Sequence, residues 1–175
     1  MIIKKSQLVH KPKKLLNITK TFIDPILTII VTVHNEVETL DYCLPSLPND
    51  YRRFEILIIS DASNSKTRKK LEEFKQRRKN IRILQNQSNK GVSFSRNRGI
   101  VNAKGKYILF LDADDYLDKE ALKDFFSFIN KKKRTEDLII FNGYYHKIKE
   151  KINKIKPFGS SIINNSNQFM SNFDK

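Results

Sequence analysis

Three aspartates lie within four positions at the end of an apolar run, in the segment KYILFLDADDYL. We call Asp112, Asp114 and Asp115 the acidic cluster. The chain as a whole is basic, with 34 lysines and arginines, 19 acids and a net charge of +15. At a separation of about 5 Å and an effective dielectric constant of about 20, two like charges repel by roughly 3 kcal/mol. Such a cluster is typical of a site for Mg²⁺ or Mn²⁺, which prefer carboxylate and phosphate oxygens as ligands.

The acidic cluster needs a framework, and the pattern of apolar residues predicts an α/β fold. Five apolar runs rich in β-branched residues predict strands at residues 26–33, 54–60, 81–85, 106–111 and 137–145. Helices are predicted between the strands. The first has Leu40, Cys43, Leu44 and Leu47 on one face, and the second is capped by Ser63 or Asn64. The third covers residues 92–103, and the fourth begins at Asp118. Strands joined by helical crossovers predict a mainly parallel sheet.

The carboxyl ends of parallel strands meet at one edge of the sheet, where ligands bind. Three predicted strand ends carry polar side chains: Thr32, His34 and Glu36 after the first strand, Ser60 and Asp61 after the second, and the acidic cluster after the fourth. Arg96 and Arg98 on the preceding helix are expected to balance the acidic charge. We therefore expect a divalent cation and a phosphate-bearing ligand at this edge.

Three segments and their spacing resemble those of the inverting family 2 glycosyltransferases, which have the GT-A fold. The segments are TIIVTVHNE, FEILIISDAS and NKGVSFSRNRGIVNAKGKYILFLDADDYL, and the resemblance covers residues 26–145. It implies a Rossmann-like, mainly parallel sheet flanked by helices. It also implies that the ligand is a nucleotide-diphosphate sugar, with a UDP-sugar favoured, and that the sugar passes with inversion to a glycan or lipid-linked acceptor, as in bacterial surface polysaccharide synthesis.

The resemblance also implies roles for single residues on the nucleotide side of the site. Thr32 and His34 match positions that line the base and ribose pocket, and Asp61 matches the acid that reads the base. His34 replaces a tyrosine that is common in the family, and Ser60 replaces the first of two usual aspartates. Arg96 matches a helix-borne arginine near the nucleotide.

On the phosphate side, the resemblance assigns Asp112 to the ribose and Asp114 to the metal ion that bridges the diphosphate, with Ala113 against the nucleotide sugar between them. Glu36 either caps the first helix or contacts the ligand. Asp115 either supports the metal site or caps the next helix.

The predicted organisation has three parts: a basic N-terminal arm at residues 1–24, a nucleotide-sugar-binding domain at 25–146 and a polar extension at 147–175. Inversion requires a carboxylate that removes a proton from the acceptor. Glu150 and Asp174, the acids after residue 146, are poor candidates because both lie in polar surroundings. We therefore expect the catalytic base outside this chain, which resembles the donor-binding half of an enzyme.

Two other functions are compatible with parts of the sequence. A Mg²⁺-dependent nucleotidyltransferase would place acids at the same strand ends, but TVHNEVE contains no glycine or lysine for a phosphate loop. A basic, non-enzymatic binding module would explain the charge but not the acidic cluster. The lysines before Asp24 suit an anionic membrane surface, whereas stacking aromatics for nucleic acid are not evident. With Cys43 as its single cysteine and no long apolar run, the chain is expected in the cytoplasm, in possible peripheral contact with the membrane.

Overall fold

The computed structural model describes residues 2–5, 25–130, 138–139 and 162–163, and the following account concerns these residues. The elements in chain order are β1 (Ile2–Lys4), β2 (Leu27–Val33), α1 (Leu40–Ser46), β3 (Phe54–Asp61), α2 (Ser65–Gln76), β4 (Ile81–Asn86), α3 (Val92–Asn102), β5 (Tyr107–Asp112), α4 (Lys119–Ile129), β6 (Leu138–Ile139) and β7 (Ile162–Ile163).

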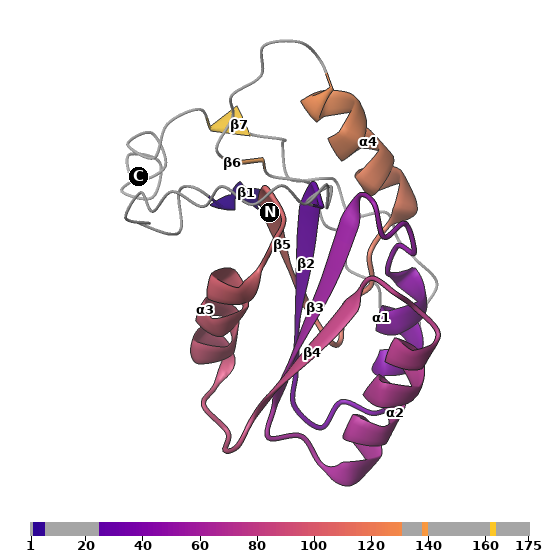
Figure 1. Cartoon of the computed structure of the whole chain (residues 1–175), viewed down its shortest axis with the longest axis vertical. Coiled ribbons are helices and arrows are strands. Elements are labelled where there is room, and N and C mark those ends of the chain that lie inside the picture. The colour runs from indigo at the N-terminus through magenta and orange to yellow at the C-terminus, as the bar shows by residue number, and fades with distance from the viewer. Residues whose placement is uncertain (1, 6–24, 131–137, 140–161, 164–175) are drawn as a thin grey trace, which may run out of the picture.

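Within the described residues, the strands form one sheet in the order β4-β3-β2-β5-β1-β6-β7 (Figure 1). The four longest strands, β4, β3, β2 and β5, are parallel to their neighbours. Each lies within one residue of the predicted boundaries, because mainly apolar runs suit a strand that is covered on both faces. The predicted fifth strand coincides with β6 at Leu138–Ile139, and residues 140–145 lie outside the described part of the chain.

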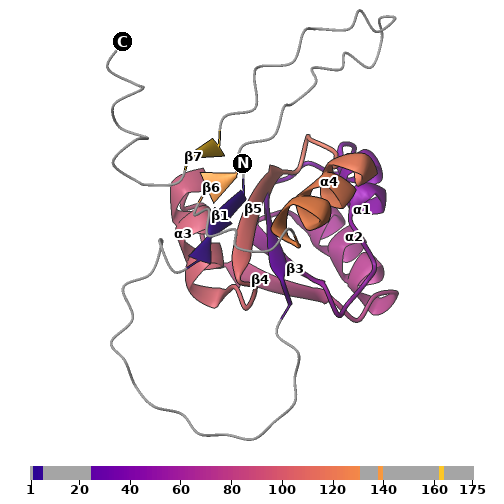
Figure 2. The same cartoon turned by 90° about the horizontal axis from the view of Figure 1, so that it is seen from above.

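Helices cover both faces of the sheet, as an α/β fold requires. α3 lies on one face, and α1, α2 and α4 lie on the other (Figures 1 and 2). The larger apolar core lies under the three helices and includes Cys43 and Phe125, which are fully buried. The smaller core lies under α3, where Ile30 and Leu57 are fully buried. Thus the prediction that Cys43 is a packing residue is confirmed.

α3 packs unusually close to the sheet, because glycines face the strands at two points. A Cβ atom on Gly99 would lie 2.6 Å from the side chain of Ile30. A Cβ atom on Gly105, in the turn between α3 and β5, would lie 2.4 Å from the backbone nitrogen of Thr28. This close approach sets the position of α3 relative to the ends of β2 and β5.

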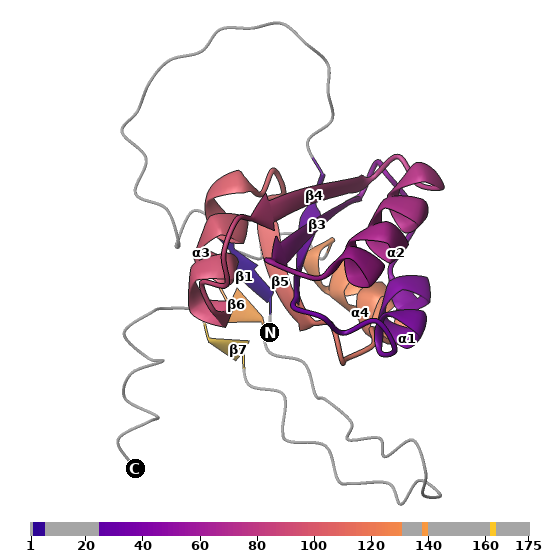
Figure 3. The same cartoon turned by 90° about the horizontal axis from the view of Figure 1, so that it is seen from below.

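A short strand extends the parallel sheet in a way that the sequence pattern did not indicate. Ile2–Lys4, within the segment assigned to a basic arm, forms β1 between β5 and β6 and is antiparallel to both (Figure 3). Ile2 is buried, and the Lys5 ammonium donates a hydrogen bond to the carbonyl of Ala103. Residues 6–24 of the proposed arm lie outside the described residues.

The capping predictions are confirmed for two helices. The side chain of Asn64 accepts a hydrogen bond from the backbone of Thr67 at the start of α2. Asp118 accepts from the backbone of Glu120 at the start of α4. No helix in the described part of the chain is long and apolar enough to cross a membrane.

Candidate functional site

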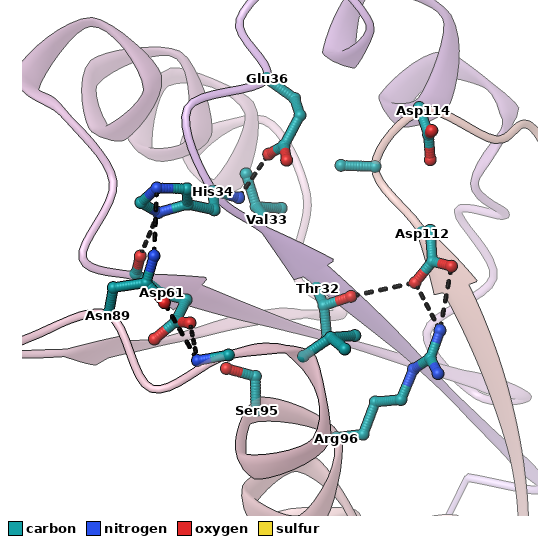
Figure 4. Close-up of a pocket in the computed structure, with 13 residues that line it drawn as sticks. Thr32, Val33, His34, Glu36, Asp61, Asn89, Ser95, Arg96, Asp112 and Asp114 are labelled. Atoms are coloured by element: carbon teal, nitrogen blue, oxygen red, sulfur yellow. Dashed lines mark hydrogen bonds and ion pairs between the residues drawn. The ribbon is translucent and has the colours of Figure 1, made fainter.

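A pocket of about 430 Å³ lies where the carboxyl ends of β2, β3 and β5 meet the start of α3 (Figure 4). The structure brings together in its lining all eight residues that the sequence nominated: Thr32, His34, Glu36, Asp61, Arg96, Asp112, Ala113 and Asp114. It adds five residues that the sequence did not single out: Val33, Asn89, Gly91, Val92 and Ser95. Four of these five belong to the segment NKGVSFS, residues 89–95, whose position between a strand and a helix was the available signal.

Two neighbours, Thr32 and Arg96, hold the carboxylate of Asp112. The Nη2 atom of Arg96 lies 2.8 Å and 2.9 Å from the two carboxylate oxygens, and the Thr32 hydroxyl donates to Oδ1 at 3.1 Å. The sheet register pairs Thr32 directly with Asp112, which places their side chains together (Figure 4). Arg96 thus supplies the expected balancing charge for one member of the acidic cluster.

Asp114 is placed differently, since its carboxylate makes no hydrogen bond to any residue in the described part of the chain. It lines the pocket beyond Asp112 (Figure 4). The described residues also contain no group of three or more His, Cys, Asp or Glu side chains arranged to hold a metal ion. Asp114 is therefore available to an incoming group, but it does not belong to a complete cage of protein ligands.

The pKa of Asp115 responds to its burial and to the other two acids of the acidic cluster. Burial, followed by the negative charges of Asp114 and Asp112, raises the pKa of the Asp115 carboxyl above its ordinary value. Its backbone nitrogen donates to the carbonyl of Asp112 in the turn that follows β5, so Asp115 does not cap α4. A cation bound beside these carboxylates would relieve the repulsion.

Asp61 is almost completely buried, with 5% of its surface exposed. Its carboxylate accepts hydrogen bonds from the side chain of Asn86 and from the backbone nitrogens of Lys90 and Gly91. Burial acts to raise its pKa, but these hydrogen bonds and the nearby His34 outweigh burial and hold the pKa below its ordinary value. Asp61 is thus ionised at neutral pH and joins β3 to the start of α3.

The His34 ring is fixed by polar contacts at both nitrogens. Nδ1 lies 2.6 Å from the carbonyl oxygen of Asp61, which can only accept, so Nδ1 carries the proton. Nε2 is then the acceptor for the side-chain amides of Asn35 at 3.2 Å and Asn89 at 3.3 Å. These in-plane contacts leave the faces of the ring as the surfaces that can contact a ligand.

Glu36 does not cap the first helix, so that alternative is wrong. The N-cap residue of α1 is Thr39, which makes no side-chain capping bond. The Glu36 carboxylate instead accepts a hydrogen bond from the backbone nitrogen of His34 inside the pocket lining. α1 begins at Leu40, four residues after Glu36, which is why the capping interpretation failed.

Two further residues point away from the roles considered for them. Arg98 donates to the carbonyl of Gln85 and to the side chain of Asn86, so it fastens α3 to the end of β4 and does not balance the acidic cluster. Ser60 donates to Ser63, whose hydroxyl donates in turn to the carbonyl of Val33. This buried chain of hydroxyls ties β3 to β2 beneath the pocket.

Residues 28–173 match the family Glycosyl transferase family 2, and the chain belongs to this family. The match covers both the strands that form the pocket and the residues that follow them. Family membership, together with the geometry of the pocket, favours the first of the three functional hypotheses.

Individual relatives agree with this assignment. A poly(ribitol-phosphate) beta-glucosyltransferase of Bacillus spizizenii is 33% identical over 106 residues, which are 58% of this chain and 17% of that protein. Solved structures of residues 1–349 of Staphylococcus aureus TarS, alone and with UDP, share 30% identity at a TM-score of 0.54 over 60% of this chain and 32% of theirs. A mannosyltransferase of Pyrobaculum calidifontis, 17% identical, has the same fold at a TM-score of 0.54 over 73% of this chain and 38% of its own. The chain therefore spans a minor part of these relatives.

Proposed function

We propose that this chain binds the nucleotide-diphosphate sugar of a glycosyltransferase that acts in cell-surface polysaccharide synthesis. The observation that carries the proposal is the meeting of Thr32, Arg96 and Asp112 with the open carboxylate of Asp114 in one pocket at the carboxyl ends of β2 and β5. Ligands of α/β sheets bind at this edge. Membership of Glycosyl transferase family 2 supports a nucleotide sugar as the ligand at this edge.

We propose that the donor is a UDP-sugar. Support comes from TarS, whose 1–349 structures were solved with UDP and with UDP-GlcNAc at 30% identity to this chain. In this chain, the nucleoside occupies the half of the pocket near His34 and Asp61, and the ribose lies near Asp112. The faces of the His34 ring offer a stacking surface, because both ring nitrogens are already engaged.

The residues present fit a divalent cation that arrives together with the diphosphate. Asp114 offers a carboxylate without a partner in the described chain, whereas Asp112 and Asp61 are held by other residues. Mg²⁺ and Mn²⁺ are commonly bound by one or two carboxylates plus phosphate oxygens and water. When bound, the metal ion supplies positive charge that stabilises the leaving nucleoside diphosphate. Asp114 is the residue that we propose holds it, and Asp112 and Arg96 orient the ribose side.

We propose an inverting transfer to a glycan or lipid-linked acceptor, with the catalytic base outside the described residues. The resemblance to the inverting family supports inversion, and the names of the Bacillus and Staphylococcus relatives each give a beta linkage. In the described pocket, Asp61, Asp112 and Glu36 already accept hydrogen bonds from the protein. Asp114 is assigned to the metal, so no carboxylate of the pocket lining is left without a role to accept the proton of the acceptor hydroxyl.

Calorimetry with UDP, CDP and GDP in the presence of Mn²⁺ tests this function. We expect UDP to bind most tightly. Equal affinities for the three nucleotides, or a preference for GDP, would show that the assignment of the donor is wrong. The absence of binding by any of them would contradict the proposed function itself.

A further inference from the structure

Charge is divided between the two ends of the parallel strands. Residues 47–53, 77–80 and 103–106 connect a helix to the amino ends of β3, β4 and β5, so they lie at one edge of the sheet, which we call the basic edge. These connections contain one acid, Asp50, and seven cations: Arg52, Arg53, Arg77, Arg78, Lys79, Lys104 and Lys106. The connections that leave the carboxyl ends of the four strands contain five acids and one lysine. The positive end of the sheet is therefore opposite the pocket.

Most of the positive charge at the basic edge is open to solvent. Six of the seven cations are exposed, and Arg78 is half-buried. The Nη1 atom of Arg78 donates to the carbonyl of Leu47 at 2.7 Å, which leaves its charge without an acidic partner there. The Nε atom of Arg53 lies 3.6 Å from the carboxylate of Asp50. The single acid of the basic edge thus balances only a small part of its charge.

The basic edge is hollowed beside α4. A cavity of about 740 Å³ lies between the connection 47–53, the start of β3 and one side of α4. Its lining includes the apolar side chains of Phe54, Leu122 and Phe126. Four cations also line it: Arg53, Arg78, Lys119 and Lys123. Asp50 is the one acid among the described residues of the lining, so the cavity adds to the attraction of this edge for anionic groups.

An exposed aromatic side chain lies at the same edge. Tyr51 is 57% exposed, and the guanidinium carbon of Arg52 lies 5.9 Å from the centroid of its ring. Tyrosine is enriched where proteins meet the headgroups of a membrane, and arginine there attracts anionic lipids. Single-stranded nucleic acid is instead bound on several aromatic side chains, on which successive bases stack. Tyr51 is the one aromatic residue of the three connections, which favours a membrane surface as the partner.

We propose that the basic edge docks on an anionic membrane surface, with the nucleotide pocket facing away from the membrane. A strand of seven residues such as β2 is roughly 20 Å long, whereas charges in physiological salt act over about 8 to 10 Å. The acids around the pocket therefore do not cancel the attraction between the basic edge and anionic headgroups. This surface is distinct from the N-terminal arm that the sequence indicated, and the proposal does not depend on the identity of the nucleotide.

Sedimentation of the full chain with lipid vesicles tests the proposal. We expect binding to vesicles of phosphatidylcholine that contain phosphatidylserine, no binding to pure phosphatidylcholine, and release at about 0.5 M salt. The double variant Arg77→Glu with Lys79→Glu should bind about tenfold more weakly or worse, because it replaces two attractive charges with repulsive ones. Lys104→Glu with Lys106→Glu, on another connection of the basic edge, should have a similar effect.

The matched control is Lys66→Glu with Arg68→Glu. It makes the same change in net charge, on exposed residues at the start of α2, which follows the carboxyl end of β3. We expect it to bind vesicles within about threefold of the unaltered chain, because these positions lie away from the basic edge. Circular dichroism checks the fold of each variant. The two edge variants change separate connections, so one still decides the question if the other does not fold.

Four results would overturn the proposal. The first is that the unaltered chain does not bind the anionic vesicles. The second is equal weakening in the control and the edge variants, which would show that net charge alone drives binding. The third is unchanged binding in the edge variants, which would place the contact elsewhere on the chain. The fourth is tighter binding to single-stranded RNA than to vesicles at the same salt, lost in the same edge variants, which would assign the edge to nucleic acid.

Discussion

Gly105 joins α3 to β5, and replacing it with alanine tests how the fold sets the geometry of the pocket. An added Cβ atom would lie 2.4 Å from the backbone nitrogen of Thr28, 2.7 Å from its hydroxyl oxygen and 2.8 Å from the carbonyl carbon of Leu27. Two of these atoms are backbone of β2, so no side-chain rotation relieves the contact. The backbone nitrogen of Gly105 also donates to the Thr28 hydroxyl at 2.8 Å, and the shift would strain this bond.

We expect Gly105→Ala to lower the free energy of unfolding by about 3 kcal/mol, which is the upper part of the range for overpacking at a rigid site. For a domain of this size, that corresponds to a fall in Tm of roughly 10 °C. Gly91→Ala is the matched control. An alanine Cβ there meets no atom within 4 Å, so only the positive φ remains as a cost, of about 1 kcal/mol.

Urea unfolding followed by circular dichroism measures both variants on the same scale. We expect Gly105→Ala also to weaken UDP binding, because the turn positions Arg96 on α3 relative to Asp112 on β5. A Gly105→Ala variant within about 0.5 kcal/mol of the unaltered chain would refute the reasoning. The same holds if Gly91→Ala were the more damaging substitution.

Three further results are expected. Burial and, to a smaller extent, the acidic cluster raise the pKa of the Cys43 thiol to about 12, so a thiol reagent at pH 8 should label only unfolded chain. The free energy of unfolding should also fall above the ordinary thiol pKa of 9.0, where only the unfolded state releases the proton. Rapid labelling of native chain would contradict this prediction. Glu55→Ala should cost about 2 to 3 kcal/mol in urea unfolding, because the Lys104 amide loses its acceptor and Arg82 loses its charged partner. Arg82 keeps its bond to the Asn102 carbonyl and is 36% exposed, which limits the cost. A change below about 0.5 kcal/mol would show that water replaces the carboxylate. Ala62→Gly should raise Tm by a few degrees, because Ala62 has a φ of 53°, and an unchanged or lower Tm would mean that the greater freedom of glycine in the unfolded chain cancels the gain.

The parallel strands were predictable because local residues determine them. Continuous apolar runs set β2 and β5, a mostly apolar run sets β3, and the caps Asn64 and Asp118 set the starts of two helices. The convergence of the strand ends then followed from the rule for parallel sheets. For the same reason, the eight residues assigned to the nucleotide sugar and the metal ion line one pocket, whereas Ser60, Arg98 and Asp115 do not.

The parts that the sequence did not predict depend on contacts between distant residues. β1 has three residues, and its place in the sheet comes from pairing Ile2 with Leu109. The Gly91 nitrogen donates both to the neighbouring Asn89 side chain and to Asp61, so a residue about thirty positions away helps to hold the segment 89–91. The role of Glu36 depends on where α1 begins. The helix begins at Leu40, a few residues too late for Glu36 to be its cap.

The central claim is that the pocket binds a nucleoside diphosphate together with a metal ion held by Asp114. Calorimetry with UDP, with and without Mn²⁺, tests it in the unaltered chain, in Asp114→Ala and in Asp124→Ala, which removes an exposed acid of α4 outside the pocket. We predict that Mn²⁺ tightens UDP binding by about tenfold or more in the unaltered chain and in Asp124→Ala, and that Asp114→Ala folds normally but loses this dependence. Equal tightening by Mn²⁺ in Asp114→Ala would contradict the account.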